Sequence, residues 1–115
     1  MNNQDELFPQ LKKMVVRGQP FTSKEAARHA LRAMSDTKRK VLIALRDNGS
    51  MADCELHDYC CARFGRRAES SYRKRRTDLS EDGHVVMSGQ IKIIDREKRV
   101  VWELSESGRQ LLAEM

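Results

Sequence analysis

Long apolar stretches are missing from this sequence, and so is the cysteine pattern of a secreted scaffold. No apolar run approaches the roughly 20 residues that a membrane-spanning helix needs, which argues against a membrane partner. The three cysteines are an odd number, two of them are adjacent, and they frame no long loop, so a disulfide framework is not expected. The N-terminus is polar and acidic and lacks the apolar core of a signal peptide. We therefore expect a cytoplasmic protein.

Arrangements of residues that would support catalysis are also lacking. The carboxylates are dispersed, and the sequence contains no phosphate-binding glycine loop and no serine or cysteine nucleophile beside a base. Cys54, His57 and Cys61 lie along one predicted helix, but a closed tetrahedral zinc site usually takes its ligands from two segments. Buried thiols are the ordinary interpretation of this stripe. The sequence predicts no enzyme activity, no metal and no cofactor.

Positive charge is plentiful, and it is concentrated in one window. The 115 residues carry a formal net charge of +5. Residues 63–76 hold seven cations and one anion, so this window carries +6 and the remaining residues sum to −1. A surplus that served only solubility would be scattered along the chain. The window instead predicts a local positive potential suited to phosphates or another polyanion.

The chain divides into an arm and a domain. Residues 1–20 show little periodicity and contain two prolines and a glycine, which predicts an N-terminal arm. Residues 21–115 show helical periodicity and then strand periodicity, which predicts one domain with a modest core.

Four helices are predicted before the periodicity changes. At the start of the first, Thr22 and Glu25 have the spacing of a capping box. Glycines at positions 49, 65 and 83 follow the ends of the other three. Either Ser50 or Asp53 could cap the third helix. The predicted ranges, in chain order, are residues 23–34, residues 35–48 including the cap, residues 52–63 and residues 68–82.

After residue 83 the period changes from 3.6 residues to 2. Apolar runs rich in valine and isoleucine flank a charged tip at residues 95–98, which predicts a β-hairpin. Trp102 in the second run is expected to anchor the core rather than stack on a base. A short terminal helix follows, with Leu111 and Leu112 facing inward. This helix either packs on its own domain or supports a homodimer, for which the N-terminal arm is the other candidate.

The fourth helix has a thin apolar face and cations over most of its remaining surface. Tyr72 and Leu79 are seven residues apart, so both fall on one face and should anchor the helix. Arg75 and Arg76 flank this face, and we predict that their guanidinium groups reach outward. Cations in the first half of a helix oppose the macrodipole, whereas a phosphate at this end would offset that cost.

Several stretches of the sequence carry a likeness to a known family. They are residues 22–27, Asp53, Glu55, Leu56, Ser71, Arg73, Arg75, Arg76, Leu79, Gly83, Val85, Ser88, Gly89, Val101 and Trp102. With them the chain resembles, over residues 21–104, the small winged helix-turn-helix DNA-binding proteins of tailed phages and prophages. The resemblance implies an α+β, mainly α fold: a three-helix core and a β-hairpin wing, with an extra N-terminal helix and a short C-terminal helix. The mixed signs of the wing tip depart from the basic loop that the resemblance implies.

The function predicted from these features is double-stranded DNA binding, as a transcriptional regulator or an accessory factor in phage DNA replication or metabolism. Base edges or inner phosphates are assigned to Ser70, Arg73, Lys74 and Thr77. Backbone phosphates are assigned to Arg66, Arg67, Arg75, Arg76, Lys92, Arg96 and Arg99. The alternative hypothesis is a winged helix whose basic face binds an acidic host or phage protein. RNA fits less well, because nothing resembles a platform of exposed aromatic rings.

Overall fold

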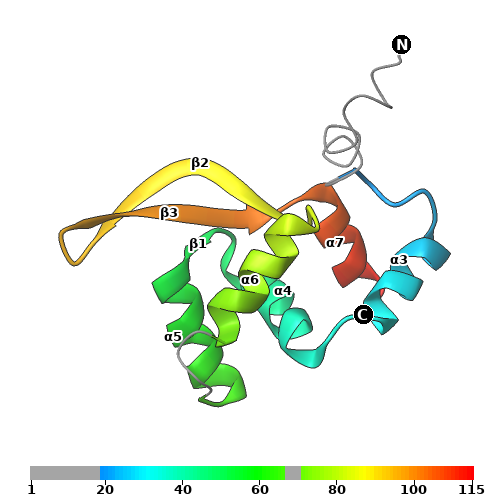
Figure 1. Ribbon diagram of the computed structural model, residues 1–115, viewed down its shortest axis with the longest axis horizontal. Helices are drawn as coiled ribbons and strands as arrows, with labels where there is room; N and C mark the ends of the chain where they lie inside the picture. The colour runs from blue at the N-terminus through cyan, green and yellow to red at the C-terminus, as the bar shows by residue number, and fades with distance from the viewer. Residues whose placement is uncertain (1–18, 67–70) are drawn as a thin grey trace, which may run out of the picture.

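The computed structural model describes residues 19–66 and 71–115, which form an α+β domain that is mainly helical (Figure 1). The elements in chain order are α3 (Lys24–Arg32), α4 (Asp36–Asn48), β1 (Met51–Ala52), α5 (Asp53–Phe64), α6 (Ser71–Glu81), β2 (Val85–Ile94), β3 (Glu97–Leu104) and α7 (Glu106–Ala113). Residues 1–18 of the predicted arm lie outside the described residues. In the described part of the chain, no helix combines the length and the apolar character needed to cross a bilayer.

The caps of the first two helices show how local side chains determine where each helix starts. Ser23, and not Thr22, is the N-cap of α3, because its Oγ accepts a hydrogen bond from the amide of Ala26 at 3.1 Å. The predicted capping box was therefore wrong by one residue at its first member. Ser35 caps α4 in the same way, accepting from the amide of Lys38 at 3.3 Å.

The core lies where α4, α5, α6 and α7 meet the inner end of the sheet. The predicted anchors of α6, Tyr72 and Leu79, are both fully buried, which confirms that part of the prediction. The hydroxyl of Tyr72 also donates to the carbonyl of Gly65 at 2.8 Å, so the start of α6 is tied to the end of α5. Other fully buried side chains are Val41, Leu42, Leu45, Leu56, Val85, Val101 and Leu111.

The sheet contains the predicted hairpin and one strand that was not predicted. β1 has two residues and pairs antiparallel with β3, with Ala52 opposite Val101, and the strand order is β1-β3-β2. The hairpin turns at Asp95 and Arg96, whose φ angles of 53° and 69° are those of a two-residue turn of the type favoured in hairpins. Glu97 and Lys98, predicted at the tip, already belong to β3.

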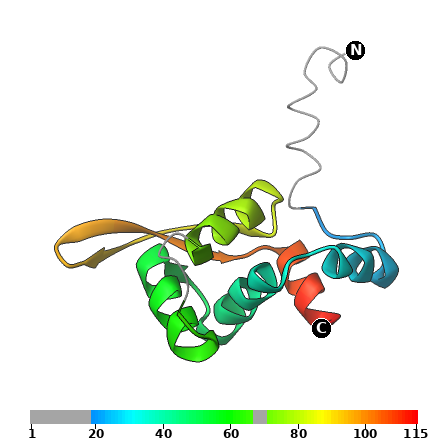
Figure 2. The ribbon, with the colours of Figure 1, turned by 60° about the horizontal axis from the view of Figure 1, so that its bottom comes forward.

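The terminal helix α7 packs on its own domain, between α3 and α4 (Figure 2). Leu111 and Leu112 are buried there, so they are not free to support a homodimer. The backbone of Gly108 touches the loop that leads into β2, and a Cβ at this position would lie 2.3 Å from the carbonyl oxygen of His84. His84 Nδ1 in turn lies 2.9 Å from Ser107 Oγ, so α7 holds the base of the hairpin.

Candidate nucleic-acid interface

The outer side of α6 carries cations that have no ion-pair partner among residues 19–66 and 71–115. Arg73, Lys74 and Thr77 are exposed, whereas Tyr72 and Leu79 on the opposite side are buried. No described carboxylate forms an ion pair with Arg73 or Lys74, and the first turn of α6 contains no acidic residue. Thr77 Oγ1 donates to the carbonyl of Arg73 at 3.1 Å and retains its lone pairs as acceptors. This surface therefore offers the donors of Arg73 and Lys74 beside the acceptor lone pairs of Thr77.

Arg76 lies on the inner side of α6, so the prediction that its guanidinium group reaches outward was wrong. Only 8% of the residue is exposed. Its Nε and Nη2 donate to the two carboxylate oxygens of Asp53 at 2.8 and 2.7 Å, and the guanidinium carbon lies 3.8 Å from the centre of the Trp102 ring. A bidentate ion pair beside an indole ring satisfies the charge locally. Arg76 therefore joins α6 to α5 and β3 and is not available to a phosphate.

Arg75 occupies an intermediate position on α6. Its Nε lies 3.4 Å from Asp78 Oδ2, one turn further along the helix, and about 30% of each side chain is exposed. Such pairs contribute little to stability at a protein surface. A phosphate could replace Asp78 as the partner of Arg75 at low cost, so this predicted contact remains available.

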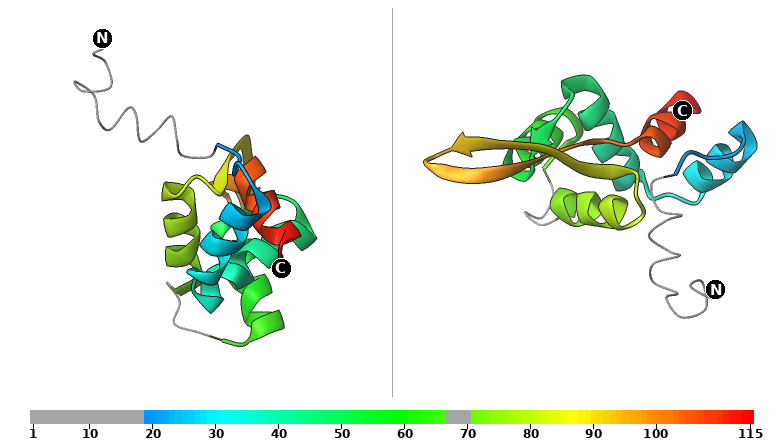
Figure 3. Two further views of the ribbon diagram at one scale, coloured as in Figure 1. Left: turned by 90° about the vertical axis from the view of Figure 1, so that its right-hand side faces the viewer. Right: turned by 90° about the horizontal axis from the view of Figure 1, so that it is seen from above.

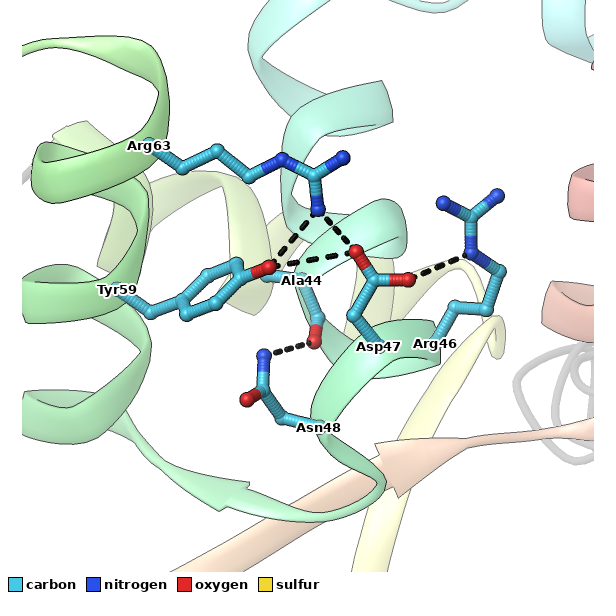
Figure 4. Close-up of polar contacts among 6 residues, drawn as sticks. All are labelled: Ala44, Arg46, Asp47, Asn48, Tyr59 and Arg63. Atoms are coloured by element: carbon cyan, nitrogen blue, oxygen red, sulfur yellow. Dashed lines mark hydrogen bonds and ion pairs between the residues drawn. The ribbon is translucent and has the colours of Figure 1, made fainter.

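Arg63, the first cation of the basic window, fastens α5 to α4 (Figure 4). Its Nη1 donates to the Tyr59 hydroxyl at 2.8 Å and to the carboxylate of Asp47. Asp47 also accepts from Nε of Arg46 at 2.9 Å. The hydrogen bonds from Arg46 and Arg63 lower the pKa of the Asp47 carboxyl group, so it stays ionised.

The segment between α5 and α6 contains three of the predicted contact residues. Arg66 is exposed directly after Gly65, whose φ angle of 108° turns the chain away from α5. Arg67 and Ser70 lie outside the described residues. The described part of this segment thus places one further cation close to the N-terminal end of α6.

Two of the four cations of the hairpin are engaged with described carboxylates. Lys92 Nζ lies 3.1 Å from Oε1 of Glu55, whose carboxylate also accepts from the amide of Ala52. Arg99 pairs with Glu97 on its own strand. Arg96 is exposed at the turn and forms no ion pair with a described carboxylate. The predicted hairpin contacts therefore reduce to Arg96 as a free cation, with Lys92 and Arg99 already paired.

A cavity of about 460 Å³ lies between α5, the start of α6 and strand β3 of the hairpin. Arg73 and Lys98 both line it, together with Asp53 and Asp58. Lys98 was not among the predicted site residues, because its cross-strand position decides which side it faces. Cys54 and His57 also line the cavity, but within residues 19–66 and 71–115 no three candidate ligands come together to hold a metal ion. The walls carry both signs of charge.

Comparison with models of protein families, with curated proteins and with solved structures found no match to this chain. The assignment of a function therefore rests on the geometry of the chain itself.

Proposed function

We propose that this chain binds double-stranded DNA as a winged helix-turn-helix protein, with the first half of α6 in the major groove. The element order supports the proposal, since a helix, a short strand, two consecutive helices and a hairpin follow one another in α4, β1, α5, α6, β2 and β3. In such an arrangement the second helix of the pair contacts base edges and its neighbours lie along the backbone.

The observation that carries the proposal is that Arg73 and Lys74 are exposed on the outer side of a firmly anchored helix and form no ion pair with any described residue. Two cations near the N-terminal end of α6 oppose its macrodipole, and no described acidic side chain offsets this. A phosphate or a base acceptor placed there would interact with the cations and the helix dipole together. Arg76 supports the same geometry, because its pair with Asp53 fixes the rotation of α6 about its axis.

In the proposed complex the cations divide by position. Arg73 and Lys74 reach base edges or inner phosphates, with Thr77 beside them. Arg66, Arg75 and Arg96 contact the phosphate backbone, and Lys98 adds to them. Arg67 and Ser70 remain predicted contacts in the segment outside the described residues. The biological role that fits such a protein is a regulator or an accessory factor in phage DNA metabolism.

The test is a fluorescence anisotropy titration of the full chain with random duplex DNA, single-stranded DNA and duplex RNA. Neutralising about five phosphates predicts that affinity for the DNA duplex falls on the order of 10²- to 10³-fold between 50 and 200 mM salt. The duplex is expected to bind more tightly than the single strand or the RNA. Absence of binding to every duplex at the lower salt concentration rules the proposal out and leaves the acidic protein partner as the remaining interpretation of the basic surface.

A further inference from the structure

The hairpin carries a set of large apolar side chains that are exposed over about half of their surface or more. Met87 is 64% exposed, Ile91 63%, Ile93 73% and Val100 44%. We call these four residues the apolar wing face. Isolated apolar residues at a protein surface are ordinary, but a contiguous group of large ones marks an interaction site.

The strand register places the four side chains on one side of the hairpin. Met87 is opposite Trp102 and Ile91 is opposite Val100. Alternate residues of a strand share a face, so Val100 and Trp102 of β3 lie on the same side together with their partners on β2. Near the body of the domain, Arg76 covers Trp102. Further out, the hairpin extends beyond the helices (Figure 3), and Ile91 and Ile93 are exposed there.

The outer edge of β2 is unpaired as well. The strand order β1-β3-β2 leaves β2 at the edge of the sheet, and its ten residues make it the longest described strand. A long apolar edge strand promotes association with another chain unless it is protected. β2 is interrupted by Ser88, Gly89 and Gln90, which lie at the register irregularity between Met87 and Ile91, and by the charge of Lys92.

The charge of the hairpin indicates what covers its apolar face. Residues 85–104 hold four cations and three anions, so they carry +1, whereas residues 63–76 carry +6. A nucleic acid or an acidic protein is attracted mainly to residues 63–76, and Arg96 and Lys98 of the hairpin add less attraction because three anions surround them. The tip alternates in sign over residues 95–98. Alternating charges are self-complementary, since a two-fold axis can place the anions of one copy against the cations of the other.

We propose that the apolar wing face is a homodimer interface, packed against the same face of a second copy across a two-fold axis. Dimerisation would remove Met87, Ile91, Ile93 and Val100 from water on both chains, and this burial is its driving force. The interface lies on the hairpin rather than on α7, whose leucines are occupied in their own core. None of the four residues carries a charge, but Lys98, a proposed phosphate contact, lies opposite Ile93 on the same side of the hairpin, so a dimer built on this face would compete with DNA for Lys98.

The test is the mass of the full chain in solution, measured by sedimentation equilibrium without nucleic acid. The wild type is expected to be a dimer at about 100 μM. Two substitutions made together, Ile91→Thr and Ile93→Thr, keep branched side chains suited to a strand and should raise the dissociation constant by about 100-fold or more. The thermal unfolding midpoint of the monomer should not fall, because both isoleucines are exposed. Hydrogen exchange at those amides of β2 that do not bond to β3 should be slower at high protein concentration than at low concentration.

The matched control is Val86→Thr, which makes a similar change on the other side of β2, opposite Glu103. The control variant should dimerise like the wild type. A wild type that stays monomeric at about 100 μM overturns the proposal. A double variant that dimerises as tightly as the wild type, or a Val86→Thr control that loses dimerisation, overturns it as well. A monomeric wild type whose double variant loses affinity for duplex DNA would assign the apolar wing face to the DNA contact instead.

Discussion

The outer side of α6 and the apolar wing face are neighbouring surfaces that expose opposite kinds of side chain. α6 exposes Arg73 and Lys74 without described partners, while the hairpin exposes Ile91 and Ile93 and has paired two of its four cations. A surface of unpaired cations favours a polyanion, and an apolar surface of low net charge favours another apolar surface. The difference indicates that the two surfaces have different partners, although both belong to one small domain.

Breaking the anchor of α6 should have the largest effect on stability. Arg76→Ala removes both hydrogen bonds to Asp53 and the contact with Trp102, and leaves the carboxylate of Asp53 without its main partner. We expect a loss of about 2 to 4 kcal/mol in the free energy of unfolding, measured by urea denaturation. Arg73→Ala on the same helix is the matched control and should leave stability unchanged. Similar stabilities for the two variants would contradict the inward position of Arg76.

Disturbing the contact between α7 and the base of the hairpin should have the second largest effect on stability. Gly108→Ala puts a Cβ 2.3 Å from the carbonyl oxygen of His84, so α7 or the loop before β2 must shift. We expect a loss of about 1 to 3 kcal/mol in the free energy of unfolding, again by urea denaturation. Ala113→Gly at the end of α7 tests the same helix without a close contact and should cost less. A neutral Gly108→Ala would show that α7 does not touch this loop.

Removing one exposed cation should separate the function of α6 from its stability. Arg73→Ala is expected to weaken duplex binding by about 1 to 3 kcal/mol, because a charged donor to a base or phosphate is lost. Arg32→Ala, at the exposed end of α3, removes the same charge far from α6 and controls for the change in net charge. Equal losses in the two variants, measured by anisotropy, would mean that only net charge matters.

The pH dependence of stability should give the smallest effect. Burial lowers the pKa of His84; the nearby charge of Asp82 raises it and that of Lys38 lowers it further. The His84 ring also stacks on Phe21 and lies beside Ser107. The unfolded chain then binds a proton more readily than the folded chain, so stability is complete above the ordinary histidine pKa and falls as the pH is lowered through it. His84→Gln should flatten this dependence in urea denaturation between about pH 5 and 7.5. A wild type that gains stability on acidification over this range would contradict the sign.

Periodicity in the sequence was enough to predict most of the helices and the hairpin. Tyr72 and Leu79 were placed correctly because a seven-residue spacing returns to the same helical face. β1 was missed because two residues are too few to show a period, and its pairing with β3 is a tertiary event. The cap at Ser23 differed from the prediction because Thr22 and Ser23 both suit that position, and only the backbone geometry decides between them.

The candidate site could be predicted only in part. The concentration of cations in the sequence predicted that α6 is the basic helix. It did not predict which of Arg75 and Arg76 pairs with a carboxylate on another element. Asp53 lies 23 residues before Arg76, and no local spacing connects them. The period of two residues predicted the hairpin, but not that it extends past the helices, so that Ile91 and Ile93 stay exposed. Both features depend on how the elements pack.

The most direct test of the account is the salt dependence of duplex binding for the wild type and for the variant Arg73→Ala/Lys74→Ala. We expect log–log plots of affinity against salt concentration to be linear, with the slope of the variant shallower by about 2, because two cations no longer displace counterions. Identical slopes for the two proteins would contradict the claim that the outer side of α6 lies against DNA.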